Sequence, residues 1–303
     1  MKVLVTGVSG YVGAALVPRL QREGYEVVGM SRTPERLELA IPLARADAVT
    51  GEGLAEAFAG VDVAYFLIHS MEPASNGTFA LQDRAAAENF ARAAQDAGIK
   101  RIVYLGGLLP AGGPASLHLA SRLEVEKILL AACPDSVALR ASIVIGARSR
   151  SFRFLVRLVE RLPVLIVPGW RDHVTTPIDQ RDIVELLARA AVNDRVAGES
   201  LDAGGPDVVS YGQLIDRIRY HMAVGRPTVE LRWTLTPIAS RVSSIIASED
   251  PALIGPLMES LDEDLLPRDD RAAQLLGVRL HSLDAAIEHA LREWEAHEPL
   301  AAR

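Results

Sequence analysis

The sequence contains little cysteine, and it lacks long apolar runs. Cys133 is the only cysteine among 303 residues, so neither an intrachain disulfide nor a cysteine-based metal cluster can form, as is typical of a reducing compartment. No apolar stretch approaches the ~20 residues that span a bilayer. A strand-like run begins at Lys2, without a charged leader followed by a long apolar segment. We therefore expect no secretory signal, no membrane span and a cytoplasmic location.

Positive charge is also scarce. The chain has 32 lysines and arginines against 39 acidic residues, a net charge of −7, and no basic run offsets this locally. Such a chain repels phosphate backbones and anionic membranes, which argues against a nucleic-acid partner. With 49% hydrophobic residues, the chain is typical of a globular protein with a sizeable core. The expected partner is a small molecule or, in a homo-oligomer, a second copy of the chain.

The first half alternates short apolar runs with longer segments of helical period, which predicts an α/β fold with a doubly wound parallel sheet of the Rossmann type. The predicted strands are Val3–Thr6, Glu26–Met30, Val63–Leu67, Ile102–Leu105 and Val137–Leu139. Between them we expect helices Ala14–Glu23 and Thr78–Ala97, each ended by a glycine.

From about Arg148 onward, amphipathic stretches are broken by prolines, which predicts a smaller, mainly helical substrate-binding region at the C-terminal side. Ser210 has capping-box spacing to Gln213, and Ser282 is expected to begin the last helix. Asp182–Ala191 has a regular amphipathic period, and a strand-like run, Ser200–Ala203, follows it. We therefore expect residues 1–147 and 176–203 to form a dinucleotide-binding domain. Residues 148–175 and 204–303 would form the substrate-binding or lid region.

A glycine-rich turn follows the first predicted strand directly and precedes a helix. It reads Thr6-Gly7-Val8-Ser9-Gly10-Tyr11-Val12-Gly13, a G-x-x-G-x-x-G spacing. Glycines let the backbone approach a pyrophosphate, whose charge is met by the N–H groups at the start of the helix. The turn thus predicts a dinucleotide site, and a purely structural tight turn is the alternative.

The second predicted strand ends in Ser31-Arg32, where a carboxylate would bind the ribose 2′-hydroxyl of NAD. A guanidinium in that position is suited to a 2′-phosphate, so the cofactor is predicted to be NADP(H). Arg36 lies about one helical turn further on and could add a contact. The alternative is that both arginines are solvated surface charges.

These features resemble the short-chain dehydrogenase/reductase superfamily, in particular its atypical, extended-type members similar to the NmrA-like and complex I accessory-subunit-like groups. The motifs that carry the resemblance are Val5–Gly13, Ser31-Arg32, Asp47-Ala48, Ala64–Met71, Tyr104–Gly107, Leu139–Ser142 and Gly204–Pro206. The resemblance implies that Asp47, beside Ala48, binds the adenine amino group. It also implies that Leu67, Ile68 and His69 line the ribose and nicotinamide side.

The superfamily's Tyr-x-x-x-Lys pair is absent, because none of the three lysines lies four residues after a tyrosine. The helix predicted over Ala115–Leu130 instead has His118 and Arg122 in the matching register, on one helix face. His118 could act as general acid, and Arg122 could hold the nicotinamide ribose. The superfamily's serine is replaced by Gly106 or Gly107.

Alternatives remain for each of these residues. His118 could be an ordinary surface histidine, and Arg122 could pair with Glu126, four residues on. His69, at the end of a strand, is a second candidate acid, or a residue that only packs or orients the cofactor. Phe152, Phe154 and Trp170 could line an apolar substrate pocket or belong to the core. No spacing indicates a metal site.

The functional hypothesis is an NADP(H)-dependent reductase of a hydrophobic carbonyl or conjugated alkene, with a non-standard proton donor. The missing tyrosine, lysine and serine support a different class, an NmrA-like regulatory or accessory protein that binds the dinucleotide without turnover. A redox-neutral isomerase or lyase is the third possibility.

Overall fold

The protein is described from a computed structural model. The structure describes residues 1–68, 79–114, 116–161, 165–167, 169–225, 228–230, 263–298 and 300. Its main sheet has seven parallel strands in the order β11-β6-β5-β4-β1-β2-β3. These strands are β1 (Lys2–Val5), β2 (Glu26–Ser31), β3 (Leu43–Arg45), β4 (Val63–Phe66), β5 (Arg101–Gly107), β6 (Val137–Ala141) and β11 (Ser200–Ala203). The predicted doubly wound α/β fold is confirmed.

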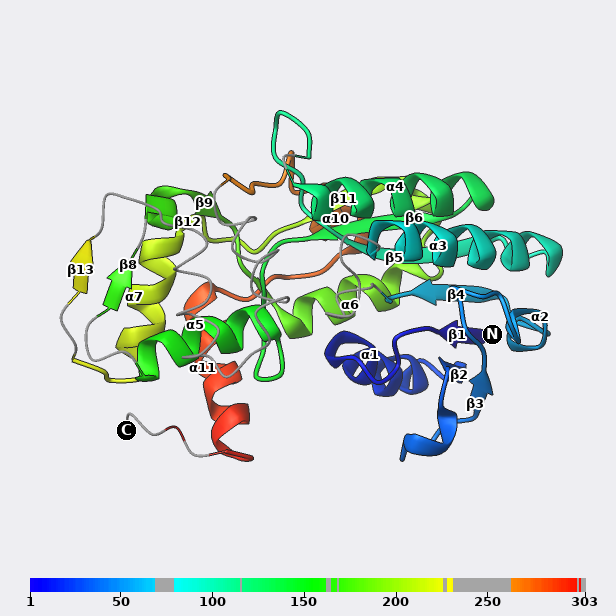
Figure 1. Ribbon diagram of the computed structural model, residues 1–303, viewed down its shortest axis with the longest axis horizontal. Coiled ribbons are helices and arrows are strands. Elements are labelled where there is room, and N and C mark those ends of the chain that lie inside the picture. The colour runs from blue at the N-terminus through cyan, green and yellow to red at the C-terminus, as the bar shows by residue number, and fades with distance from the viewer. Residues whose placement is uncertain are drawn as a thin grey trace.

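Helices cover both faces of this sheet (Figure 1). On one face α1 (Tyr11–Arg22) packs against α6 (Gln180–Ala190), and on the other α3 (Phe79–Asp96) packs against α4 (Leu117–Ala132). Because both faces are covered, the central strands are largely apolar, and all four residues of β4 are buried. Each face has its own core cluster, one around Tyr65 and one around Tyr104 and Phe90.

The order of the strands reverses between β1 and β4, since the chain first winds outward through β2 and β3 and then returns to β4. In such sheets, ligands bind at this reversal, outside the carboxyl ends of the strands. Short elements lie beside these strands: η1 (Pro34–Arg36) follows β2, α2 (Leu54–Ala57) follows β3, and η3 (Asp194–Val196) precedes β11.

The second half of the chain forms a group of helices to the side of the sheet, on the left in Figure 1. Its helices are α5 (Arg150–Arg161), α7 (Tyr211–His221) and α11 (Leu283–Glu295), which share one buried cluster. Short strands accompany them: β7 (Val144–Ile145), β8 (Leu165–Val167), β9 (Val174–Thr175), β10 (Ile178–Asp179), β12 (Val209–Ser210) and β13 (Thr228–Glu230). Two further elements among the described residues are η2 (Gly169–Asp172) and α10 (Arg271–Leu276).

Local chemistry explains where these helices begin. Ser210 and Gln213 form the predicted capping box of α7, and Ser282 caps α11 through the Ala285 N–H. Phe152, Phe154 and Trp170 are buried in the cluster between the helices, so their bulk belongs to the core and does not line an open pocket. The strand β11 pairs with β6, while the division of the chain into two functional regions stays a prediction.

Candidate nicotinamide cofactor and catalytic site

The glycine turn lies between β1 and α1, at the reversal of the sheet. Gly7 has a positive φ of 62°, and a Cβ placed on it would be 2.9 Å from the Leu67 carbonyl oxygen. A Cβ on Gly13 would be only 2.3 Å from the Gly7 carbonyl oxygen. Side chains at either position would therefore displace the main chain, which explains why glycine is needed at both.

The start of α1 is suited to an anion. Gly10 is the N-cap residue, no side chain caps the helix, and the first turn contains no acidic residue. The first N–H groups of a helix have no acceptor within it, and the helix dipole adds positive charge there. Residues Ser9 to Gly13 thus present a compact main-chain surface that fits a pyrophosphate.

Tyr11 connects this turn to the second half of the chain. Its hydroxyl is hydrogen-bonded to Ser149, just before α5, and burial raises the pKa of Tyr11 above its usual range. Gln180, at the start of α6, donates to the Tyr11 carbonyl oxygen at 3.4 Å. The side chain of Tyr11 therefore serves as a structural link, while the main chain of Tyr11 and Val12 remains at the helix start.

Arg32 and Arg36 are both exposed, just after the carboxyl end of β2. Between them in sequence lies Glu35, whose carboxylate is 2.5 Å from the Arg45 guanidinium. Arg45 also donates to the Arg32 carbonyl oxygen at 3.1 Å. Sequence reasoning missed Arg45, because it ends β3, a three-residue strand too short to show periodicity. Arg45 therefore neutralises the carboxylate that lies between Arg32 and Arg36 in the sequence.

The loop after β3 is closed by Asp47. Its Oδ1 accepts from the Val49 N–H at 2.8 Å, and its main-chain carbonyl accepts from the Gly51 N–H at 2.8 Å. Asn89 of α3 donates to the carbonyl oxygens of Ala48 and Val49.

Leu67 and Ile68 follow β4 on the other side of β1 and are half-buried. Their predicted contacts with a cofactor stay predictions, and His69 lies outside the described residues.

His118 and Arg122 lie one turn apart on α4, which begins at the N-cap Ser116. The positive charge of Arg122 acts on two neighbours. It lowers the pKa of His118, and it opposes the increase that burial causes in the pKa of Tyr104. Tyr104, on β5, donates its hydroxyl to the Arg122 carbonyl oxygen at 3.2 Å. The structure therefore brings the His118–Arg122 pair to the strand that ends in Gly106-Gly107.

Burial is the main cause of a low pKa of about 4 for His118, and the charge of Arg122 adds to it. The imidazole is consequently neutral at pH 7. The sequence-based assumption of a pKa near neutrality is wrong in this respect. At Arg122 the Nε atom is buried and has no hydrogen-bond partner among the described residues. A buried unpaired donor costs about 1–3 kcal/mol, which an acceptor supplied by a ligand would recover.

The alternative pairing of Arg122 with Glu126 is wrong. Glu126 instead accepts from Arg140 of β6, at 2.8 Å from Nε and 2.6 Å from Nη2.

The two glycines that end β5 differ in how much room a side chain would have. A Cβ on Gly106 would be 2.9 Å from the Tyr104 ring, whereas on Gly107 it would make an ordinary 3.9 Å contact with Leu119. Gly107 is therefore the position with room for the missing serine.

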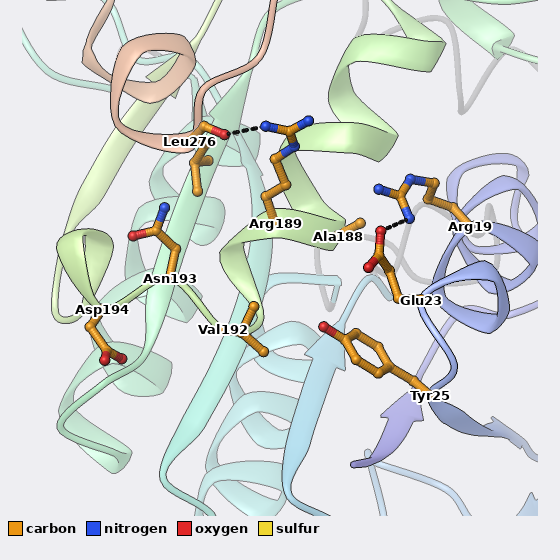
Figure 2. A pocket seen from close by; sticks show the side chains of 9 residues that line it. All are labelled: Arg19, Glu23, Tyr25, Ala188, Arg189, Val192, Asn193, Asp194 and Leu276. Atoms are coloured by element: carbon orange, nitrogen blue, oxygen red, sulfur yellow. Dashed lines mark hydrogen bonds and ion pairs between the residues drawn. The ribbon is translucent and has the colours of Figure 1, made fainter.

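No group of three histidine, cysteine or carboxylate side chains among the described residues is arranged to hold a metal ion, and none of the described helices has the length and apolarity to cross a membrane. A pocket of about 560 Å³ lies between the C-terminal ends of α1 and α6, away from the glycine turn (Figure 2). Its arginines are already paired, Arg19 with Glu23 and Glu185 and Arg189 with Glu185.

Comparison with known proteins agrees with this geometry. Residues 7–129 match the NAD(P)H-binding family model, and this segment contains the glycine turn, Arg32 and the His118–Arg122 pair. This segment of the chain is therefore similar to NAD(P)H-binding domains. The glycine cradle and the unpaired Arg122 Nε fit a dinucleotide of this kind.

Three known proteins illustrate the similarity. An uncharacterised Mycobacterium tuberculosis protein is 28% identical over 250 residues, covering 82% of this chain, which spans only 26% of that relative's length. A 2-alkyl-3-oxoalkanoate reductase of Stenotrophomonas maltophilia is 26% identical over 76% of this chain and 78% of its own. The UDP-glucuronic acid 4-epimerase of Bacillus cereus, solved with UDP-glucuronic acid and NAD, shares the fold with a TM-score of 0.73. It is 17% identical over 98% of this chain and all of its own.

Proposed function

We propose that the protein is an NADP(H)-dependent reductase of a hydrophobic small-molecule carbonyl or conjugated alkene. The observation that carries the proposal is the His118–Arg122 pair on α4, next to the carboxyl end of β5 and within the NAD(P)H-binding segment. The relative named 2-alkyl-3-oxoalkanoate reductase supports an oxidoreductase of carbonyl compounds. When bound, the nicotinamide would supply the hydride.

The preference for NADP(H) rests on the arginines at the ends of β2 and β3. Arg45 pairs with Glu35, so this carboxylate is neutralised and does not repel a 2′-phosphate. Arg32 and Arg36 are exposed beside it and would bind the phosphate. Asp47, with Ala48, would bind the adenine, and Leu67 and Ile68 would contact the ribose side.

The proposed chemistry of His118 follows from its neutral state. At neutral pH no imidazolium is available as the acid. The neutral imidazole can instead donate its N–H proton to the oxygen of the substrate while its other nitrogen takes up a proton from water. His118 would thus relay a proton and end neutral, as the other imidazole tautomer. Arg122 would bind the nicotinamide ribose hydroxyls through its unpaired Nε.

Consumption of NADPH in the presence of a panel of apolar ketones, aldehydes and enones tests this proposal. We expect at least one compound to be reduced with equal amounts of NADPH consumed and product formed. Replacing His118 by Phe should lower the turnover by about 10²–10⁴-fold and leave NADPH affinity nearly unchanged. Tight cofactor binding without any NADPH consumption would instead favour the dinucleotide-binding regulatory or accessory protein.

Calorimetric titration of NADPH and NADH tests the cofactor preference separately. We expect NADPH to bind more tightly, and Arg32→Ala to weaken NADPH alone by about 1.5–3 kcal/mol, the worth of a charged hydrogen bond. Equal affinities for the two cofactors in the unchanged protein would contradict the assignment.

A further inference from the structure

The last residue of β5, Gly107, is a glycine that its own backbone does not require. Unlike Gly7, it lies outside the left-handed region of φ, and a Cβ on it would have a single neighbour within 4 Å among the described residues, Leu119 Cδ2 at 3.9 Å. Gly106 is different, because a Cβ there would be 2.9 Å from the Tyr104 ring. A side chain is therefore absent at Gly107 without a steric reason, and its place beside the strand is open to a ligand.

The main chain around this place is fixed by hydrogen bonds. Gly107 pairs with Ala141 of β6, and the next residue, Leu108, donates its N–H to the Ala141 carbonyl oxygen at 3.1 Å. Earlier on the strand, Tyr104 donates its hydroxyl to the Arg122 carbonyl oxygen at 3.2 Å, which ties β5 to α4. The spacing between the end of the strand and this helix is thus set, and the space beside Gly107 has a defined size.

The wall of this space is aliphatic. Leu119 packs in one buried cluster with Leu108 and Leu265, and the half-buried Leu109 packs against them. Leu119 is held in place because its N–H donates to the side chain of the N-cap Ser116 at 3.2 Å. Leu265 comes from the second half of the chain, so both halves contribute to the wall.

These surroundings decide which part of a substrate fits beside Gly107. Apart from the adjoining residues of the chain, no polar atom of the described residues lies within 4 Å of a Cβ at that position. An oxygen placed there would lose its hydrogen bonds to water without gaining a donor, whereas an alkyl group would gain from burial against the leucines. Under the proposed function the carbonyl oxygen binds at His118, the residue before Leu119. The alkyl group beside Gly107 must then be attached close to the carbonyl.

We propose that Gly107 determines the shape of the substrate, and that its open position takes an alkyl branch on the carbon next to the carbonyl. A straight-chain ketone has no group for this space and leaves water against the leucine wall. The inference rests on the proposed function for the reaction and for the position of the carbonyl oxygen. To that function it adds the branching of the substrate and the residue that selects it.

Competition between two isomeric ketones, 2-octanone and 3-methyl-2-heptanone, tests the inference. The isomers have the same composition, and only the second is branched next to the carbonyl. With NADPH and equal amounts of both ketones, the ratio of the two alcohols early in the reaction equals the ratio of the kcat/KM values. We expect the unchanged protein to favour the branched ketone by about fourfold, the effect of one buried methyl group. Gly107→Ala fills the space with its own methyl group and should lower this ratio about tenfold or more.

Gly112→Ala is the matched control, since a Cβ at Gly112 has no atom of the described residues within 4 Å. It should leave the product ratio unchanged, and both variants should unfold at the temperature of the unchanged protein. A lower unfolding temperature for Gly107→Ala alone would contradict the inference, because the position would then not be open.

The inference is also wrong if the unchanged protein favours 2-octanone, or if Gly107→Ala leaves the product ratio as it is. The same holds if another compound of the panel of ketones, aldehydes and enones is reduced but neither isomer is. Reduction of no compound in the panel would instead contradict the proposed function itself, and the inference would fall with it.

Discussion

His118 lies half-buried beside Arg122. Burial, and to a smaller extent the positive charge of Arg122, lowers the pKa of its imidazole to about 4. In the unfolded chain the pKa returns to 6.5. The unfolded state therefore binds the proton more readily, and stability contributed by the neutral histidine is present above about pH 6.5 and is lost as the pH falls toward 4.

This shift predicts a measurable pH dependence. Between about pH 7 and pH 4.5, the free energy of unfolding should fall by an amount on the order of 2–3 kcal/mol through His118. His118→Phe should flatten this decline. Carboxylates with lowered pKa values, such as Glu185 at about 2, lose their contribution only below pH 4.5. Urea denaturation across this range checks the prediction, and an identical decline in the variant would contradict it.

At the scale of elements, the glycine turn and α1 form one unit whose geometry depends on main-chain contact between Gly7 and Gly13. A methyl group on Gly13 would be 2.3 Å from the Gly7 oxygen and 3.0 Å from the Val8 Cα. Gly13→Ala should therefore shift the turn, cost about 1–3 kcal/mol of stability and weaken NADPH binding by roughly tenfold or more.

Gly112→Ala is the control for this substitution, since no atom lies within 4 Å of a Cβ at that position. It should leave NADPH affinity and stability nearly unchanged. Calorimetry and denaturation measure both quantities. Gly13→Ala binding NADPH as tightly as the control would show that the turn does not hold the dinucleotide.

The elements also show how far the sequence predicts the structure. Apolar runs predicted the central strands to within two residues, and β4 is Val63–Phe66 against an expected Val63–Leu67. Likewise, the capping box of Ser210 identified the start of α7. Strands such as β3, β8 and β9 were missed, because two or three residues carry no periodicity. Arg45 was missed with β3 as a result.

Side-chain pairing is less predictable than the elements. Glu126 lies four residues from Arg122 on one helix, yet it pairs with Arg140, which strand β6 brings to it. The burial of His118 and the contact of Trp170 with Tyr211 depend on which helices pack together, and one sequence does not specify that.

At the scale of the whole molecule, buried charges join distant parts of the chain. Glu126 on α4 pairs with Arg140 on β6, and Arg140 lies 3.8 Å from Asp202 on β11. Asp202 in turn accepts from Arg268, which precedes α10, at 2.8 Å. Ser200 also donates to Glu126 at 2.6 Å. The network thus connects the helix that carries His118 to the last part of the chain.

Breaking this network should be costly. Glu126→Ala leaves Arg140 buried with a weaker partner, and we expect a loss of about 3–5 kcal/mol. Glu124→Ala, two residues earlier on α4, removes an exposed carboxylate that pairs with Arg84 and should cost about 0–1 kcal/mol. Urea denaturation of both variants makes the comparison. Similar losses would mean that the buried network contributes no more than a surface ion pair.

The central claim is that a chain without Tyr-x-x-x-Lys transfers hydride from NADPH to a carbonyl or enone. Transfer of deuterium from NADPH labelled at the reactive nicotinamide position tests this most directly, with the product analysed by mass spectrometry. The expected product carries one deuterium for each labelled NADPH consumed. Saturable binding of NADPH with no deuterium in any compound of the panel would contradict the claim.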